Sequence, residues 1–255
     1  MLAFTADHFG PAALREVSRY SRYARTCPLD TFRTILLAVP ILLFSAMAHE
    51  YAHAYAAMKQ GDNTARDLGL LTFNPLKQID PFMTIILPVS LAVMGWPVFG
   101  GVKGVPVNPK NYQHYVRGDI IVSLAGIAAN FTIAAICVPL IVLVGMWGAN
   151  ASALVTPLAI FQLMLEKGVQ INLLLAVFNL LPIPPLDGSH VFKHLLPLRW
   201  AILYQRIGSA GLLILLLLLS FGGPLLSAWF TPIGLIYQRL AGVFAPYMLP
   251  SPFPQ

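Results

Sequence analysis

Charge is scarce in this sequence. Only 10% of the 255 residues are Asp, Glu, Lys or Arg, whereas 57% are hydrophobic, and the mean hydropathy is +0.72. Soluble domains contain about 25% charged residues, and no polar stretch here is long enough to form a separate soluble domain. The composition therefore predicts an integral membrane protein.

Three further features that the sequence lacks narrow the class of protein. The net charge of +6 comes from basic residues scattered between apolar runs, so a nucleic-acid partner is not expected. The two cysteines, Cys27 and Cys137, lie in very different settings and do not indicate a disulfide framework. Residues 1–30 have no apolar core followed by small residues, so no cleaved signal peptide is expected. This segment instead resembles an interfacial amphipathic helix, with Arg15, Arg19, Arg22 and Arg25.

Long apolar runs fill most of residues 31–255. A bilayer span needs about 20 largely apolar residues, and residues 34–58, 119–149 and 208–230 meet this requirement. Residues 168–188 are just long enough, and Glu166 and Lys167 separate them from a shorter apolar piece, residues 151–165. Residues 82–102 are interrupted by Pro and Gly, so they either cross or re-enter, and residues 228–249 could form a last short helix. We expect an all-α polytopic membrane protein with four to six transmembrane or re-entrant helices.

The first apolar run ends in "AHEYAHAYAAMKQG", residues 48–61. On a helix, His49 and His53 lie on one face, where they can bind one metal ion, with Glu50 on an adjoining edge. This H-E-x-x-H pattern is typical of zinc proteases, in which the Glu is the general base and zinc lowers the pKa of water to about 7. The alternative is three polar residues packed between helices, but an ionisable group at membrane depth costs about 2.5–3.5 kcal/mol.

A third ligand is expected in "FNLLPIPPLDG", residues 178–188. Pro182, Pro184 and Pro185 cannot continue a helix, so the preceding span should end near Leu181. Gly188 then lets the chain turn, and Asp187 is presented from unwound backbone, which membrane proteins tolerate only inside protein or beside a water-filled cavity. The alternative is an Asp in an ordinary interfacial turn, which the presence of the H-E-x-x-H motif in the same sequence disfavours.

Together the two motifs resemble the site-2 protease family of intramembrane zinc metalloproteases. The resemblance runs from about residue 36 to residue 196 and includes "GDNTARDLGLLTFNPLKQIDP", "GVPVNPKNY" and "SLAGIAANF". It implies one zinc ion held by His49, His53 and Asp187, with Glu50 as catalytic base. It also implies that Asn179 binds the substrate, and it matches Asn130 to another family Asn that we also expect to bind substrate. For both residues the alternative is a hydrogen bond between helices.

The resemblance also bears on architecture. It implies a small β element around "LGLLTFNP" and "GVPVNP", within the membrane-associated region 59–118 between the first two core helices. No PDZ-type or nucleotide-binding module is expected. Ile127 and Gln78 stand where the family usually has Pro and His.

His190 and His194 are four residues apart. They could be a second metal-binding pair or an accessory proton donor, but we favour a third reading, in which they are part of a polar interfacial helix.

The two motifs also constrain topology. His53 and Asp187 lie near the ends of their helices, so both reach one metal ion only if these ends share a membrane face, which requires residues 82–102 to re-enter. Nine of the 16 basic residues then lie on the side of the metal, which the positive-inside rule assigns to the cytoplasm; they are Lys59, Arg66, Lys77, Lys103, Lys110, Arg117, Lys193, Arg199 and Arg206. The N-terminal arginines, including Arg33, do not fit this rule.

We therefore expect a zinc-dependent endopeptidase of the cell (inner) membrane that cleaves single-span membrane proteins within or near their transmembrane helix. The alternative is a zinc-binding membrane transporter or non-proteolytic scaffold. A transporter should carry further ligands along a path through several helices, whereas the ionisable residues here converge on one site. The expected partners are a transmembrane protein substrate and the lipid bilayer.

Overall fold

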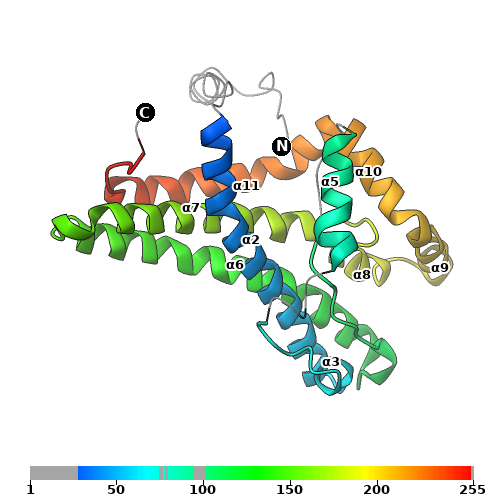
Figure 1. Cartoon of the computed structure of the whole chain (residues 1–255). Helices are drawn as coiled ribbons and strands as arrows, with labels where there is room; N and C mark the ends of the chain where they lie inside the picture. Colours follow the sequence, from blue (N-terminus) through cyan, green and yellow to red (C-terminus); the bar gives the residue numbers. More distant parts are fainter. Residues whose placement is uncertain (1–27, 75–76, 78–79, 95–100, 254–255) are drawn as a thin grey trace.

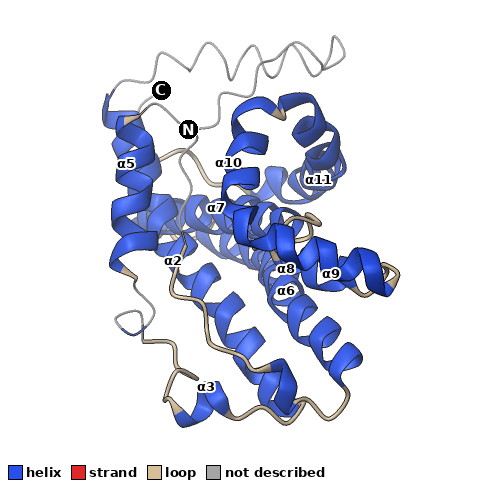
Figure 2. Ribbon diagram, turned by 90° about the vertical axis from the view of Figure 1, so that its right-hand side faces the viewer, coloured by secondary structure: helices blue, strands red, loops and turns tan. Residues whose placement is uncertain are grey.

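The computed structural model describes residues 28–74, 77, 80–94 and 101–253 as an assembly of helices and loops (Figures 1 and 2). The predicted interfacial segment 1–30 lies almost wholly outside the described residues. The α-helices are α2 (Pro28–Lys59), α3 (Thr64–Asp67), α5 (Leu87–Val93), α6 (Tyr115–Gly148), α7 (Val155–Asn179), α8 (Asp187–Lys193), α9 (Leu198–Ile207), α10 (Gly211–Phe221) and α11 (Gly223–Phe244). A π-helix, Pro81–Ile86, leads into α5, and 3₁₀ turns occupy Pro109–Asn111, Ser152–Leu154, Gly208–Ala210 and Ala245–Tyr247.

Three long helices form the centre of the molecule. Helices α6 and α7 pack side by side, and α2 crosses both of them (Figure 1). Helix α11 lies along α7, and one apolar cluster is formed by residues of α6, α7 and α11: Ala134, Cys137, Ile141, Leu165, Val169, Leu173 and Phe244. These helices are apolar on nearly every face, as expected for segments that contact both protein and lipid.

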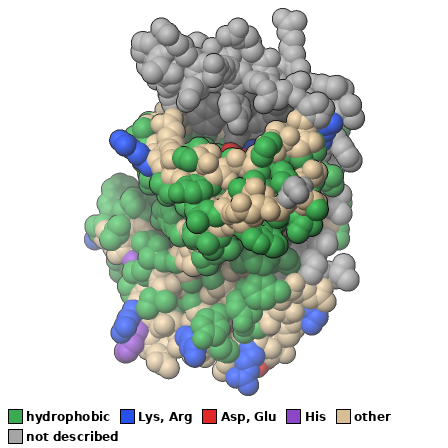
Figure 3. All heavy atoms as spheres, turned by 90° about the vertical axis from the view of Figure 1, so that its left-hand side faces the viewer, with side chains coloured by type: hydrophobic (Ala, Val, Ile, Leu, Met, Phe, Trp, Pro, Cys, Tyr) green, Lys and Arg blue, Asp and Glu red, His purple; other side chains and the backbone are tan. Residues whose placement is uncertain are grey.

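Three of the described helices are long and apolar enough to cross a bilayer: Arg33–Lys59 within α2, Tyr115–Gly148 and Val155–Asn179. A fourth candidate consists of Leu198–Arg206 and Gly211–Phe221, which meet at 80° and form either a broken span or a re-entrant loop. Hydrophobic side chains cover much of the face seen in Figure 3, and most of its Lys and Arg side chains lie at the lower edge. The chain is a multi-pass membrane protein.

Two helix boundaries differ from those expected. Residues 155–179 form one continuous helix through Glu166 and Lys167, because both charged groups find partners: Tyr237 donates to Glu166 Oε1 at 2.8 Å and Lys167 donates to Gln170 Oε1 at 3.0 Å. Residues 208–230 are not one helix. The chain breaks at Gly222, because Pro224 suits the first turn of a new helix and cannot continue the old one.

The predicted β element is not found among the described residues between α2 and α6, which form short helices and irregular backbone (Figure 2). Residues 101–108 run without regular structure, and their amide groups bind side chains instead of a neighbouring strand. Val105 N–H donates to Glu50 and Asn108 N–H donates to Asp62. Part of the segment in which the resemblance implied strands is thus a loop held by two carboxylates.

The helical piece at residues 81–93 is too short to cross a bilayer. Its 13 residues measure about 20 Å at 1.5 Å per residue, against a hydrocarbon core of about 30 Å. After residues 95–100, which lie outside the described part of the chain, residues 101–108 run beside Glu50 of α2 and Asp62, which follows α2. Re-entry of residues 82–102 stays a prediction.

Candidate metal centre

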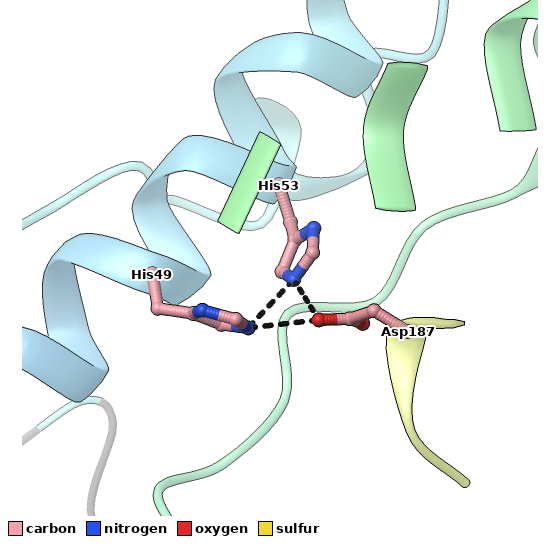
Figure 4. A group of neighbouring side chains, drawn as sticks. All are labelled: His49, His53 and Asp187. Carbon is pink, nitrogen blue, oxygen red and sulfur yellow. Dashed lines mark hydrogen bonds and ion pairs between the residues drawn. The ribbon is translucent and has the colours of Figure 1, made fainter. Parts of the chain in front are cut away.

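His49, His53 and Asp187 meet at the place where α2 faces the start of α8 (Figure 4). The Nε2 atoms of the two imidazoles lie 2.9 Å apart, and Asp187 Oδ2 lies 3.0 Å from Nε2 of His49 and 3.3 Å from Nε2 of His53. Both imidazoles are buried, and 21% of the Asp187 side chain is exposed. Residues far apart in the sequence thus lie close together in the structure.

The hydrogen bonds at Nδ1 of the two imidazoles show which ring nitrogens carry the protons. His53 Nδ1 lies 2.7 Å from the Val122 carbonyl oxygen, which can only accept, so Nδ1 donates. His49 Nδ1 likewise donates to Asn130 Oδ1 at 2.6 Å. In neutral imidazoles the protons are then on Nδ1, and both Nε2 atoms present lone pairs. Two lone pairs and a carboxylate oxygen, buried within 3.3 Å of one another, repel unless a cation lies between them.

A zinc ion fits this cluster. Ligands bound to zinc tetrahedrally at about 2.0–2.1 Å lie about 3.3 Å apart, close to the observed separations of 2.9–3.3 Å. In addition, Asp187 Oδ2 is buried without a hydrogen-bond partner in the described structure. Neutral imidazoles that donate through Nδ1, together with one carboxylate, are the usual donor set of a catalytic zinc site.

The end of α7 and the start of α8 present Asp187. Helix α7 stops at Asn179, and residues 180–186, with their three prolines, form an irregular turn before Asp187 opens α8. Asp187 is therefore the first residue of a short helix, not part of an unwound stretch. Gly188 is helical, and a Cβ there would collide with the carbonyl oxygens of Leu180 and Leu181. This glycine is needed for close packing against the end of α7, not for a turn.

Helix α6 supports the two imidazoles from the opposite side. At Gly126 it passes so close to them that a Cβ would lie 2.5 Å from His53 Nε2 and 2.6 Å from His49 Nε2. One turn earlier, the Val122 carbonyl accepts the His53 hydrogen bond. Neither residue was singled out from the sequence, although Gly126 stands inside the "SLAGIAAN" segment.

A buried chain of polar side chains connects His49 to three helices. Asn130 on α6 accepts from His49 and donates to Asn172 Oδ1 on α7 at 3.0 Å, and Asn172 donates to Ser45 Oγ on α2 at 2.8 Å. Asn130, Asn172 and Ser45 are completely buried. Ser45 and Asn172 were missed, although polar residues within apolar runs were the available signal. The environment of Asn130 favours orientation of His49 over direct substrate contact.

Glu50 lies beside the metal ligands and is covered by the loop at residues 101–108. Its Oε2 accepts a 2.8 Å hydrogen bond from Val105 N–H, and its carboxylate lies within electrostatic range of His53, His49 and Asp187. Asp62, which is buried, holds the other end of the loop by accepting from Asn108 N–H and Asn111 Nδ2. Burial would raise the pKa of the Asp62 carboxyl, but these hydrogen bonds and those from Thr64 hold it below its usual range.

The remaining candidates lie around this centre. Asn179 is half-buried at the end of α7 and donates to Leu175 O in its own helix at 3.0 Å. His190 and His194 approach Asp119 on α6, and in the described part of the chain neither belongs to a group that could hold a metal. Ile127 is buried in α6, and Gln78 lies outside the described residues.

Comparisons with known proteins define the class of this site. The sequence model described as "Peptidase family M50" matches residues 149–222, which include Asp187. "Putative zinc metalloprotease YwhC" of Bacillus subtilis is 39% identical over 160 residues, covering 61% of this chain and 67% of that protein. "Putative zinc metalloprotease Rip2" of Mycolicibacterium smegmatis is 30% identical over 221 residues, covering 85% of this chain and 78% of that protein.

A "Putative zinc metalloprotease Rip2" of Mycobacterium tuberculosis is 28% identical to this chain, in an alignment that covers 82% of it. No solved structure matches. An alignment that covers 85% of this chain must include both the histidine pair and Asp187. The chain belongs to peptidase family M50, the site-2 proteases, and the metal implied by this family of zinc metallopeptidases is the one that the donor set fits.

Proposed function

We propose that this protein cleaves single-span membrane proteins within or near their transmembrane helix, at a zinc site that faces the cytoplasm. The observation that supports this most directly is the position of the H-E-x-x-H motif inside a helix able to span the bilayer. A peptide bond must come to this site, so the substrate should itself be embedded in the membrane.

The side chains at the metal centre have three roles: metal binding, orientation of the ligands and proton transfer. His49, His53 and Asp187 hold the metal, and Asn130 and the Val122 carbonyl orient the two imidazoles. A zinc ion held by these residues would supply Lewis acidity toward the scissile carbonyl and a water that is nucleophilic near neutral pH. The Glu50 carboxylate takes the proton from the attacking water and delivers it to the nitrogen of the leaving amine.

The loop over Glu50 bears on access to this carboxylate. Val105 N–H occupies one acceptor position of Glu50 Oε2, and a carboxylate has further acceptor positions for water, so a shift of the loop at residues 101–108 would free the whole carboxylate for catalysis. Asn179 stands at the end of α7, three residues from the irregular turn's first proline, and supplies a polar group to the substrate backbone.

Two arguments favour this function over a zinc transporter or a scaffold. Among the described residues, only one group of His, Cys, Asp and Glu side chains could hold a metal ion, whereas transport needs successive sites. Two other acidic groups inside the long helices have partners within the protein: Asp119 contacts Lys193, and Glu166 accepts from Tyr237.

The direct test uses the full chain in lipid vesicles of Escherichia coli polar lipids, together with a panel of tagged single-span proteins. We expect cleavage within or near the span, mapped by mass spectrometry, to stop with a chelator and return with added zinc. Glu50→Gln should keep zinc and lose cleavage by about 10²–10⁴-fold, the usual worth of general acid–base catalysis. Zinc-dependent cleavage confined to water-exposed loops would contradict the proposal.

Orientation has its own test. Single cysteines are placed at Lys110 and Arg117 in a chain whose Cys27 and Cys137 are replaced by Ser and Ala, and intact cells are treated with a membrane-impermeant maleimide. We expect labelling only after the membrane is permeabilised, because these positions lie on the proposed cytoplasmic side. Labelling in intact cells would place the metal centre on the other face.

A further inference from the structure

A second cluster of ionisable groups joins the start of α6 to the end of α8. Asp119, in the second turn of α6, is only 3% exposed. Lys193 Nζ lies 2.6 Å and His194 Nε2 lies 2.7 Å from Asp119 Oδ2, and His190 Nδ1 lies 3.5 Å from Oδ1. The hydrogen bonds and ion pairs recorded for these side chains in the described part of the chain do not include a metal ligand, and the mechanism above does not use them.

The strongest contacts in this cluster are those of Lys193 and His194. Lys193 is itself buried, whereas the His190 side chain is 47% exposed. His190 Nδ1 also lies 3.4 Å from Lys193 Nζ, where it can accept a hydrogen bond, so it is a peripheral member. Tyr115, one turn before Asp119, packs edge-on against the His194 ring and lies under the Lys193 ammonium. One face of the first two turns of α6 therefore holds the last turn of α8.

Helix α8 depends on such contacts for its position. It has seven residues, far fewer than the 12–15 below which an isolated helix is marginal in water, and prolines precede and follow it. Its first turn is fixed by the packing of Gly188 against the end of α7. Its last turn is fixed by Asp119. Asp187, the third metal ligand, is the first residue of the helix that these two contacts hold.

Helix α6 also fixes the other two ligands. Asp119, Val122, Gly126 and Asn130 are spaced by three, four and four residues, which places them along one face of the helix. The Val122 carbonyl binds His53, Gly126 packs against both imidazoles and Asn130 binds His49. Asp119 extends this face to α8.

We propose that Asp119 is a positioning residue for the metal centre: through Lys193 and His194 it fixes α8 against α6, so that Asp187 meets His49 and His53. The effect of Asp119 on catalysis rests on the proposed function. Its effect on metal binding does not, so metal binding and catalysis are measured separately.

The test compares zinc affinity and the visible absorption of the Co²⁺-substituted protein in wild type, Asp119→Asn, Lys193→Met and the double variant. Co²⁺ bands report the geometry of the ligands, which a change in stability alone does not alter. We expect Asp119→Asn to bind zinc more weakly, by up to the roughly 10–100-fold that the loss of a direct partner of a ligand costs, with altered Co²⁺ bands. Turnover should fall through kcat, with KM little changed, because no substrate contact is lost.

The double variant is the control for misfolding of Asp119→Asn. Removing one partner of a buried pair leaves an unpaired charge, whereas removing both is often tolerated. We expect the double variant to lose no more zinc affinity than Asp119→Asn, because both changes break the same contact. Asp62→Asn is the matched control, since Asp62 is an equally buried and hydrogen-bonded carboxylate away from α8; its zinc affinity and Co²⁺ bands should be those of wild type.

Two results would overturn the proposal. One is unchanged zinc affinity and unchanged Co²⁺ bands in a folded Asp119→Asn or double variant, which would make Asp119 a purely stabilising residue. The other is additive losses from Asp119→Asn and Lys193→Met, which would mean that the two residues act independently. Absence of proteolysis in every form, with the metal effects intact, would contradict the proposed function and leave the role of Asp119 standing.

Discussion

Gly126 shows how little space the metal centre has. A methyl group at this position would lie 2.5–2.6 Å from ring atoms of His49 and His53, closer than carbon and nitrogen approach without a bond. The atoms it would meet belong to rigid rings whose outer nitrogens are tied to Val122 and Asn130. The rings therefore cannot turn aside without losing their partners.

We expect Gly126→Ala to abolish or strongly reduce zinc binding while the helices remain folded. Elemental analysis of purified protein, with circular dichroism as the check on folding, measures this. Gly234→Ala is the matched control, because Gly234 lies in α11 and a Cβ there meets nothing within 4 Å. Full zinc content in Gly126→Ala would show that the two imidazoles are not fixed as the structure has them.

Asn130 separates two roles that the sequence left open. If it orients His49, as its 2.6 Å hydrogen bond and complete burial suggest, Asn130→Leu should weaken zinc binding about 10–100-fold. If it contacts substrate, the same variant should keep its zinc and raise KM. Zinc titration against a competing chelator, together with steady-state kinetics, distinguishes the two; we expect the first result.

At the scale of elements, the sequence predicted the helices that carry the site better than the segments around them. The H-E-x-x-H spacing and the prolines before Asp187 act locally, so they could be read from a few neighbouring residues. The loop at residues 101–108 could not, because its conformation depends on Glu50 and Asp62, which lie about 50 residues earlier. Asp119 was missed for the same reason: its partners lie in α8, where His190 and His194 resembled a metal pair.

The anchorage of this loop should depend on pH. Because hydrogen bonds lower the pKa of the folded-state Asp62 carboxyl, its stabilising contribution is complete at neutral pH. It begins to fall when the pH drops to the ordinary value of about 3.9 and is lost below the lowered folded-state pKa. We expect the protection of the Asn108 amide, measured as its hydrogen-exchange rate relative to the intrinsic rate at the same pH, to fall in this acidic range. In Asp62→Asn this protection should be low already at neutral pH and change little on acidification.

The same loop links Asp62 to turnover. Asp62→Asn loosens the loop that places Val105 N–H on Glu50, so we expect altered kcat with unchanged zinc content. If the Asn108 amide were equally protected in wild type and Asp62→Asn, Asp62 would not be the anchor of the loop.

At the scale of the whole molecule, the long helices place a hydrolytic site within an apolar protein, and this limits what can be cut. The amide groups of a transmembrane helix are bonded internally, so the scissile carbonyl is shielded until the helix unwinds. In lipid, each freed backbone group costs several kcal/mol. Unwinding therefore has to occur against polar partners in the enzyme, and Asn179, half-buried at the end of α7 beside the turn that leads to Asp187, is suited to this.

We therefore expect substrates to carry helix-weakening residues, Gly, Asn or Pro, near the cytoplasmic end of the span, and replacement of these by Leu should slow cleavage strongly. Asn179→Ala should impair cleavage without releasing zinc. Asn150→Ala is the matched control, because Asn150 also donates to the carbonyl four residues earlier but at the far end of α6. Vesicle assays with paired substrates that differ only in these residues measure the effect. If all-Leu spans were cut as fast as weakened ones, local unwinding would not limit the reaction, and the role given to Asn179 would fall with it.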